Sequence, residues 1–275
     1  MKVIINRISY HLVKHQQDPS LPCLLLLHGF MGSGRVFDHL IKPLSRFVNP
    51  VTLDLLGHGR TPGADSAERY HVDYQLEDLH SIVSCLNKEK IFIHGYSMGG
   101  RLALRYALQH PETVAGLILE STNYGITDPS ERDRRLKLDE QRAAAIESDF
   151  SHFLSDWQQL PLFRHQADIP EEMVSSYKAI QQRQDPVNMA RSLRGFGTAR
   201  MPPVKHSLFQ LCMPVLLLAG ENDKKYRNIL NEMDQDIPKS KFHIIRKAGH
   251  RIHLEHPRAF IDQVKAFVFS SACNS

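Results

Sequence analysis

A serine set between two glycines is the residue in this chain best suited to chemistry. Ser97 lies in Gly95-Tyr96-Ser97-Met98-Gly99, after the apolar segment 91–93 and before the helical pattern of 101–108. A strand-to-helix turn this tight holds the serine hydroxyl away from the sheet in a strained conformation. A β-carbon at either glycine would collide with the neighbouring strand or helix. The spacing therefore predicts a nucleophile elbow.

A serine hydroxyl needs a histidine to take its proton and a carboxylate to orient that histidine. Both types of residue follow apolar, strand-like segments: Asp223 in Gly220-Glu221-Asn222-Asp223, and His250 in Ala248-Gly249-His250. The carboxyl ends of parallel strands meet at one edge of a sheet, so we expect Ser97, Asp223 and His250 to converge there. Glu221 is a rival to Asp223 for the role of the acid.

Other loops offer supporting groups or competing interpretations. The backbone amides of Met98 and of Phe30, whose loop is rich in glycine, are expected to form an oxyanion hole. His28 and His58 are expected to hold loops in place. The spacing of His250, His253 and His256 suggests a metal, but positions i, i+3 and i+6 do not share one helical face, and no acidic cluster accompanies them. We therefore predict no metal site.

The order of the apolar segments predicts an α/β fold. Strand-like and helix-like segments alternate from residue 20 to about 124, which predicts a parallel sheet with helices on both faces. From 125 to 208 the chain is polar and helical, rich in arginine, and holds the only tryptophan. The alternation then resumes. We predict one core, formed by 1–124 and 209–275, with an inserted helical cap at 125–208. The expected strands are 23–27, 51–54, 91–94, 114–119, 213–220 and 241–245, and the expected helices include 72–86, 98–109 and 257–269.

Composition narrows the class of protein. The chain has 275 residues, 42% of them hydrophobic, and a formal net charge of +4 without a basic stripe, which argues against nucleic-acid binding. Its longest apolar runs are too short to span a membrane, and the N-terminus lacks a signal-peptide pattern. Four cysteines lie far apart and are expected to be buried free thiols. We expect a cytoplasmic protein that does not insert into membranes.

Several short stretches resemble one branch of the α/β-hydrolase superfamily, the 2-succinyl-6-hydroxy-2,4-cyclohexadiene-1-carboxylate synthases. The chain resembles the superfamily along most of its length. The stretches similar to this branch are the elbow with Arg101 after its double glycine, Glu120 with 131–135 as a cap entry, 156–163 with Trp157 and Phe163, 192–198, 220–226 with Lys225, and 248–257.

The resemblance implies an α/β-hydrolase fold, no cofactor and a lyase reaction of menaquinone or phylloquinone biosynthesis. The substrate is a small polycarboxylate that loses a proton next to its succinyl ketone and then expels pyruvate. Ser97, activated by His250, would be the general base. The implied anion clamp comprises Arg101, Arg135, Arg183 and Lys225, with Arg132 and Arg134 as neighbours of Arg135, and the apolar wall comprises Tyr96, Trp157 and Phe163.

Two other functions remain open at this point. A serine hydrolase (a carboxylesterase, thioesterase or carbon–carbon bond hydrolase) would use the same three side chains. A ligand-binding receptor would keep the fold but turn over slowly. The arginines of the cap are also explicable as solvated helix faces paired with nearby carboxylates. We expect a monomer or a weak homo-oligomer.

Overall fold

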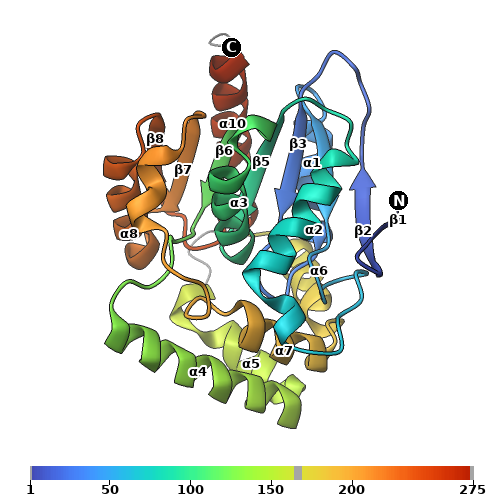
Figure 1. Ribbon diagram of the computed structural model, residues 1–275, viewed down its shortest axis with the longest axis vertical. Helices are drawn as coiled ribbons and strands as arrows, with labels where there is room; N and C mark the ends of the chain where they lie inside the picture. The colour runs from blue at the N-terminus through green and yellow to red at the C-terminus, as the bar shows by residue number, and fades with distance from the viewer. Residues whose placement is uncertain (1, 164–168, 273–275) are drawn as a thin grey trace.

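An eight-stranded sheet forms the centre of the computed structural model, which describes residues 2–163 and 169–272 (Figure 1). The strand order is β1-β2-β4-β3-β5-β6-β7-β8. Strands β3 to β8 are parallel, as predicted, whereas β1 and β2 form an antiparallel hairpin whose second strand pairs with β4. The bounds are β1 (Lys2–Ile5), β2 (Ile8–Lys14), β3 (Cys23–Leu27), β4 (Asn49–Leu53), β5 (Ile91–Tyr96), β6 (Val114–Glu120), β7 (Val215–Gly220) and β8 (Ser240–Ile245).

Helices cover both faces of the sheet because each central strand is apolar on both sides. Leu25 and Leu27 face one core together with α2 (Val72–Ser84), α3 (Met98–Gln109) and α8 (Lys224–Asp236). Leu24 and Leu26 face a second core with α1 (Asp38–Leu44) and α10 (Pro257–Ala272). Continuous apolar runs of this kind suit parallel strands that are buried on both faces.

The chain between β6 and β7 forms a helical insertion, which Figure 1 shows below the sheet. Its helices are α4 (Pro129–Ser148), α5 (Phe150–Gln159), α6 (Glu171–Gln182) and α7 (Pro186–Phe196). Asp128, Asp149 and Asp185 each cap a helix by accepting the amide three residues later. A small apolar cluster, which includes Ile146 of α4 and Leu193 of α7, joins the insertion to Met31 of the core. As predicted, the described residues of this insertion contain helices and no strand.

The cysteines and Glu120 depart from the expectations. Cys23, Cys85 and Cys212 are free thiols, but only Cys23 is buried, because the other two lie outside the strands; Cys273 lies outside the described residues.

Glu120 does not belong to a cap entry: it ends β6 and is completely buried. Within the described ranges no helix is long and apolar enough to cross a membrane.

Candidate active site

Ser97 stands on the sharp turn between β5 and α3, in a strained backbone conformation. Its φ and ψ are 51° and −105°, in a region that non-glycine residues rarely adopt. A β-carbon on Gly95 would come within 2.5 Å of the Gly100 Cα at the start of α3, and one on Gly99 within 2.4 Å of the Leu27 carbonyl oxygen on β3. The glycines therefore permit the close approach that the sequence predicts at both sides of this turn.

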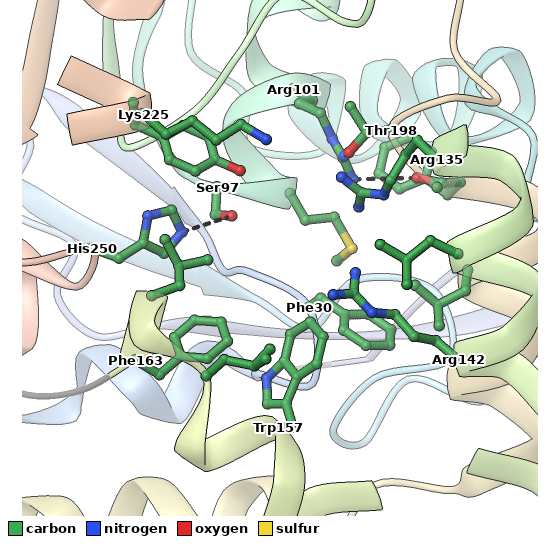
Figure 2. Close-up of a pocket in the computed structure, with 18 of the residues that line it drawn as sticks. Phe30, Ser97, Arg101, Arg135, Arg142, Trp157, Phe163, Thr198, Lys225 and His250 are labelled. Carbon is green, nitrogen blue, oxygen red and sulfur yellow. Dashed lines mark hydrogen bonds between the residues drawn. The ribbon is translucent and has the colours of Figure 1, made fainter. Parts of the chain in front are cut away.

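The imidazole of His250 lies between Ser97 and Asp223. Its Nδ1 is 2.6 Å from Asp223 Oδ2, and its Nε2 is 3.3 Å from Ser97 Oγ (Figure 2). Asp223 and His250 are both buried, in the loops that follow β7 and β8. Glu221, the rival acid, is exposed and accepts the amide of Lys247 instead. Tertiary structure thus brings the three expected side chains into a Ser-His-Asp arrangement able to move a proton.

The two amides expected to form an oxyanion hole belong to residues that line the same cavity as Ser97. Met98 is the first residue of α3, so its N–H has no acceptor within the helix. Phe30 follows Gly29, where a β-carbon would lie 2.6 Å from the Tyr96 ring. The loop can approach the elbow closely for this reason.

His28 fixes the loop that carries Phe30. Leu55 N donates to His28 Nε2 at 3.0 Å, so Nδ1 carries the hydrogen and donates to Gly29 O at 2.7 Å. Burial lowers the pKa of His28 to about 4, so the neutral ring that makes both bonds is the stable form. His58 is equally buried, and its Nδ1 lies 2.9 Å from Leu56 O. Both histidines hold loops, as expected.

A cavity of about 460 Å³ lies between the elbow and the insertion. Its walls come from the elbow, from α4, α5 and α7, from the first turn of α8 with Lys225, and from the loop that carries His250. Among the described residues, six arginine or lysine side chains line it, against one carboxylate, that of Glu131. These basic residues are Arg101, Arg134, Arg135, Arg142, Lys225 and Arg251. Such an excess of positive charge suits an anionic ligand.

Arg101 is one of the two buried cations of this set, together with Arg251. It projects from the first turns of α3, is only 9% exposed, and donates to the Thr198 hydroxyl and the Phe196 carbonyl (Figure 2). Burial, followed by repulsion from Arg135, lowers its pKa to about 10. No described carboxylate forms an ion pair with it. The guanidinium is therefore charged at neutral pH and has no anionic partner within 2–163 and 169–272.

Two arginines of α4 share one buried carboxylate. Arg135 Nε lies 2.8 Å and Arg142 Nη1 lies 3.8 Å from Asp139 Oδ1. Arg142 also lies over the ring of Trp157, 5.1 Å from its centroid, and burial followed by repulsion from Arg135 lowers its pKa. Burial, again followed by Arg135, lowers the pKa of Lys225. The cations of the cavity therefore repel one another, and a bound anion would reduce this repulsion.

The aromatic residues expected to form an apolar wall all line the cavity. Trp157 and Phe163 are in contact at 5.1 Å between ring centroids, and Phe163 and Tyr96 both lie against the ring of His250. The expectation for Arg183 is wrong in position, because this residue follows the last residue of α6, is exposed and does not line the cavity.

The sequence interpretation missed several cavity residues, among them Arg142, Thr198, Tyr226 and Arg251. Arg142 lies on α4 seven residues after Arg135, which places both on one helical face, and this spacing was the available signal. Arg251 lies between the rings of Phe163 and Tyr177, 4.3 Å from each centroid, and no local sequence pattern predicts that contact.

The histidines near position 250 point to different partners. His250 binds Asp223, whereas His253 Nδ1 lies 2.8 Å from Glu120 Oε1. Glu120 Oε2 in turn lies 2.9 Å from His94 Nε2. Burial alone would raise the pKa of Glu120, but the two imidazoles hold it well below its usual value. No group of three or more metal-ligating side chains is placed to hold an ion in 2–163 or 169–272.

Comparisons with known proteins agree with this architecture. The model of the α/β hydrolase fold family matches residues 22–257. A Bacillus subtilis (strain 168) protein, to which 2-succinyl-6-hydroxy-2,4-cyclohexadiene-1-carboxylate synthase activity is ascribed, is 36% identical over 250 residues, which cover 90% of each chain. The synthase of that name from Enterobacter sp. (strain 638) is 31% identical and matches 88% of this chain and 89% of its own.

A solved structure is similar to this protein in its three-dimensional fold. MenH from S. aureus superposes with a TM-score of 0.90 at 32% identity, covering 96% of this chain and 98% of its own. The predicted α/β-hydrolase fold with its helical insertion is therefore confirmed. The chain belongs to the α/β-hydrolase family and, within it, to the 2-succinyl-6-hydroxy-2,4-cyclohexadiene-1-carboxylate synthases.

Proposed function

We propose that this protein is a lyase that converts 2-succinyl-5-enolpyruvyl-6-hydroxy-3-cyclohexene-1-carboxylate into 2-succinyl-6-hydroxy-2,4-cyclohexadiene-1-carboxylate and pyruvate. The observation that carries the proposal is the excess of arginine and lysine around a cavity into which Ser97 opens. The substrate bears several carboxylates, and guanidinium groups bind carboxylates with paired hydrogen bonds. Membership of the synthase family supports the same activity.

The reaction begins with removal of a proton from the carbon next to the succinyl ketone. Ser97 Oγ takes this proton while His250 Nε2, 3.3 Å away, accepts the hydroxyl hydrogen. Asp223, 2.6 Å from Nδ1, holds the ring in the required tautomer and stabilises its charged form. The C–H electron pair forms an enolate. Its collapse gives the conjugated ring diene and breaks the C–O bond to the enolpyruvyl group, and the departing enolate of pyruvate takes back the proton held by His250 and becomes pyruvate.

Two amides are proposed to stabilise the enolate oxygen. The N–H of Phe30 belongs to a loop that His28 holds, and the N–H of Met98 belongs to the first turn of α3. Both donors are therefore fixed before substrate arrives. Fixed donors need little reorganisation when charge develops. In other enzymes, removal of one such donor costs about 2.7–4 kcal/mol of transition-state stabilisation.

The charged residues of the cavity are proposed to bind the carboxylates. Arg101, Arg135 and Lys225 form the anion clamp, to which we add Arg142 from its place beside Trp157. Arg183 is not part of this proposal. Tyr96, Trp157 and Phe163 supply the apolar wall against which the ring of the substrate packs.

We further propose that residues 125–208 act as a cap on a core formed by 1–124 and 209–275. Helices α4, α5 and α7 contribute to the cavity from the insertion, while Ser97 and His250 come from the core. The substrate is accordingly held between the two parts. Free Cys23, Cys85 and Cys212 support an enzyme of the reducing cytoplasm.

The test is to incubate the protein with the enolpyruvyl substrate and to measure pyruvate with a coupled lactate dehydrogenase assay. We expect sustained release by the wild type and a large loss in S97A and H250A. No pyruvate from the wild type would refute the activity, and normal release by S97A would refute the proposed base. Rapid turnover of simple aryl esters with a trapped acyl-serine would instead identify a serine hydrolase.

A further inference from the structure

The loop that carries His250 is held by a carboxylate outside the Ser-His-Asp arrangement. Glu255 Oε2 accepts the N–H of Gly249 at 2.7 Å, and Glu255 Oε1 accepts the N–H of Arg251 at 3.1 Å. One side chain therefore holds the amides on both sides of His250. We propose that Glu255 is a positioning residue, which sets the orientation of the His250 imidazole toward Ser97.

The interactions of Glu255 are directed to the backbone of this loop. Its carboxylate is buried, since the residue is 7% exposed, and among the described residues it forms no ion pair with a lysine, arginine or histidine. The neighbouring guanidinium of Arg251 instead lies between two aromatic rings of the insertion. A buried carboxylate is costly unless hydrogen bonds satisfy it, and those to Gly249 and Arg251 do so here.

A second carboxylate anchors the next turn. Glu120, at the end of β6, accepts the backbone N–H of His253 at 3.0 Å and contacts His253 Nδ1 at 2.8 Å. The short helix α9 (Ile252–Glu255) is thereby fixed to the sheet. With α9 fixed, the orientation of residues 249–251 depends on the side chain that returns from the end of this helix, which is Glu255.

The geometry of His250 makes it sensitive to this support. Its ring must stay in contact with Asp223 Oδ2, 2.6 Å from Nδ1, and with Ser97 Oγ, 3.3 Å from Nε2, at the same time. The second distance is already long for a hydrogen bond. A small rotation of the loop breaks the contact with Ser97 before it breaks the contact with Asp223. Misplacement of a catalytic group by about 1 Å costs up to about 100-fold in rate.

The decisive variant is E255Q, with E221Q as its matched control. Glutamine keeps the shape of Glu255 but turns an amide N–H toward one of the two backbone donors, so one hydrogen bond is lost. Glu221 is also a glutamate that accepts a backbone amide near the end of β8, that of Lys247, but it is exposed and does not contact His250. E221Q therefore reports the effect of losing a loop carboxylate that does not support the imidazole.

We expect E255Q to lower kcat for pyruvate release by about 10- to 100-fold. KM should stay within about twofold of the wild-type value, because Glu255 does not line the cavity. E221Q should leave both constants within about twofold. E255D keeps the charge but its side chain is one carbon shorter, so it should show the same selective loss of kcat. It replaces E255Q as the test variant if E255Q does not fold. Equal kcat in E255Q and E221Q, or a loss confined to KM, would overturn the inference.

A second measurement separates this inference from the proposed function on which it rests. A fluorophosphonate probe reacts with an activated serine: the Ser97 Oγ–phosphorus bond forms, fluoride leaves, and His250 takes the hydroxyl proton. Intact-protein mass spectrometry then gives the rate of labelling, which should fall in E255Q by the same factor as kcat. If wild type labels but releases no pyruvate, the proposed function fails while the labelling comparison still tests Glu255. A wild type that does neither refutes both.

Discussion

Replacing Arg101 by methionine should reduce activity strongly while leaving folding stability almost unchanged. A pKa lowered from 12.5 to about 10 means that burial and nearby charge destabilise the folded, charged form by about 3 kcal/mol. The side chain is protonated at neutral pH in both folded and unfolded states, so this cost applies in full below pH 10. Methionine removes this cost, but it also removes the two hydrogen bonds to Thr198 and Phe196. A hydrogen bond from a charged donor stabilises the folded state by at least about 1.5 kcal/mol, so the two losses together offset the gain. The net change in unfolding free energy is expected to lie within about 1 kcal/mol.

Activity should respond very differently. A guanidinium that binds a substrate carboxylate contributes about 1.5–3 kcal/mol, so R101M should lower kcat/KM by about 10- to 150-fold. The assays are pyruvate release at varied substrate concentration and equilibrium urea denaturation. Truncation of an ordinary buried side chain would instead lower stability by about 2–5 kcal/mol.

Arg105 supplies the matched control. It lies one turn further along α3, is also 9% exposed, and has a pKa lowered to about 10, chiefly by burial. It donates to the Pro202 carbonyl and does not line the cavity. R105M should therefore keep kcat/KM within about twofold. Wild-type kcat/KM in R101M, or an equal loss of activity in R105M and R101M, would contradict a role of Arg101 in binding the substrate.

Three further outcomes follow from the same structure. D223N should lower kcat by about 10³- to 10⁴-fold with little change in KM, because an amide no longer holds the triad imidazole in its required tautomer; preserved turnover would exclude Asp223 as the acid. G99A should lower the unfolding free energy by more than about 2 kcal/mol in thermal or urea denaturation, because its β-carbon would meet a main-chain oxygen of β3 at 2.4 Å. Stability should also fall on acidification below about pH 6.5, since burial lowers the pKa of His28 to about 4 and that of His58 to about 3, and the unfolded chain then binds more protons. Between pH 7 and pH 5 the loss should reach about 4 kcal/mol in urea titrations, and equal unfolding free energies at the two pH values would contradict it.

Much of the core could be predicted because parallel strands that are buried on both faces consist of short, continuous runs of apolar residues. The strand at 23–27, the strand predicted at 91–94 within β5, and the helix at 98–109 all follow from such local patterns. The hairpin of β1 and β2 was not predicted, although Ile8, Tyr10 and Leu12 alternate with less buried residues in the manner of a half-covered strand.

The order of the chemical groups along the chain also follows from local patterns alone. Ser97, Asp223 and His250 each follow an apolar strand, and strand ends in a parallel sheet share one edge, so their convergence needs no knowledge of side-chain packing. The glycines of the elbow were equally predictable, since steric exclusion at a tight turn is a local property.

Packing between elements sets which cations face the cavity and which carboxylates support the site. Arg142 lines the cavity and Arg183 does not, because the direction of an insertion side chain depends on how its helix packs. The buried hydrogen bond from the His253 amide to Glu120 forms only when β6 and α9 come together. Glu255 accepts amides of its own loop, and the fold of that loop buries its carboxylate. Local patterns fix where a chain turns and which face it buries, whereas the partner of a buried charge is set by contacts between distant segments.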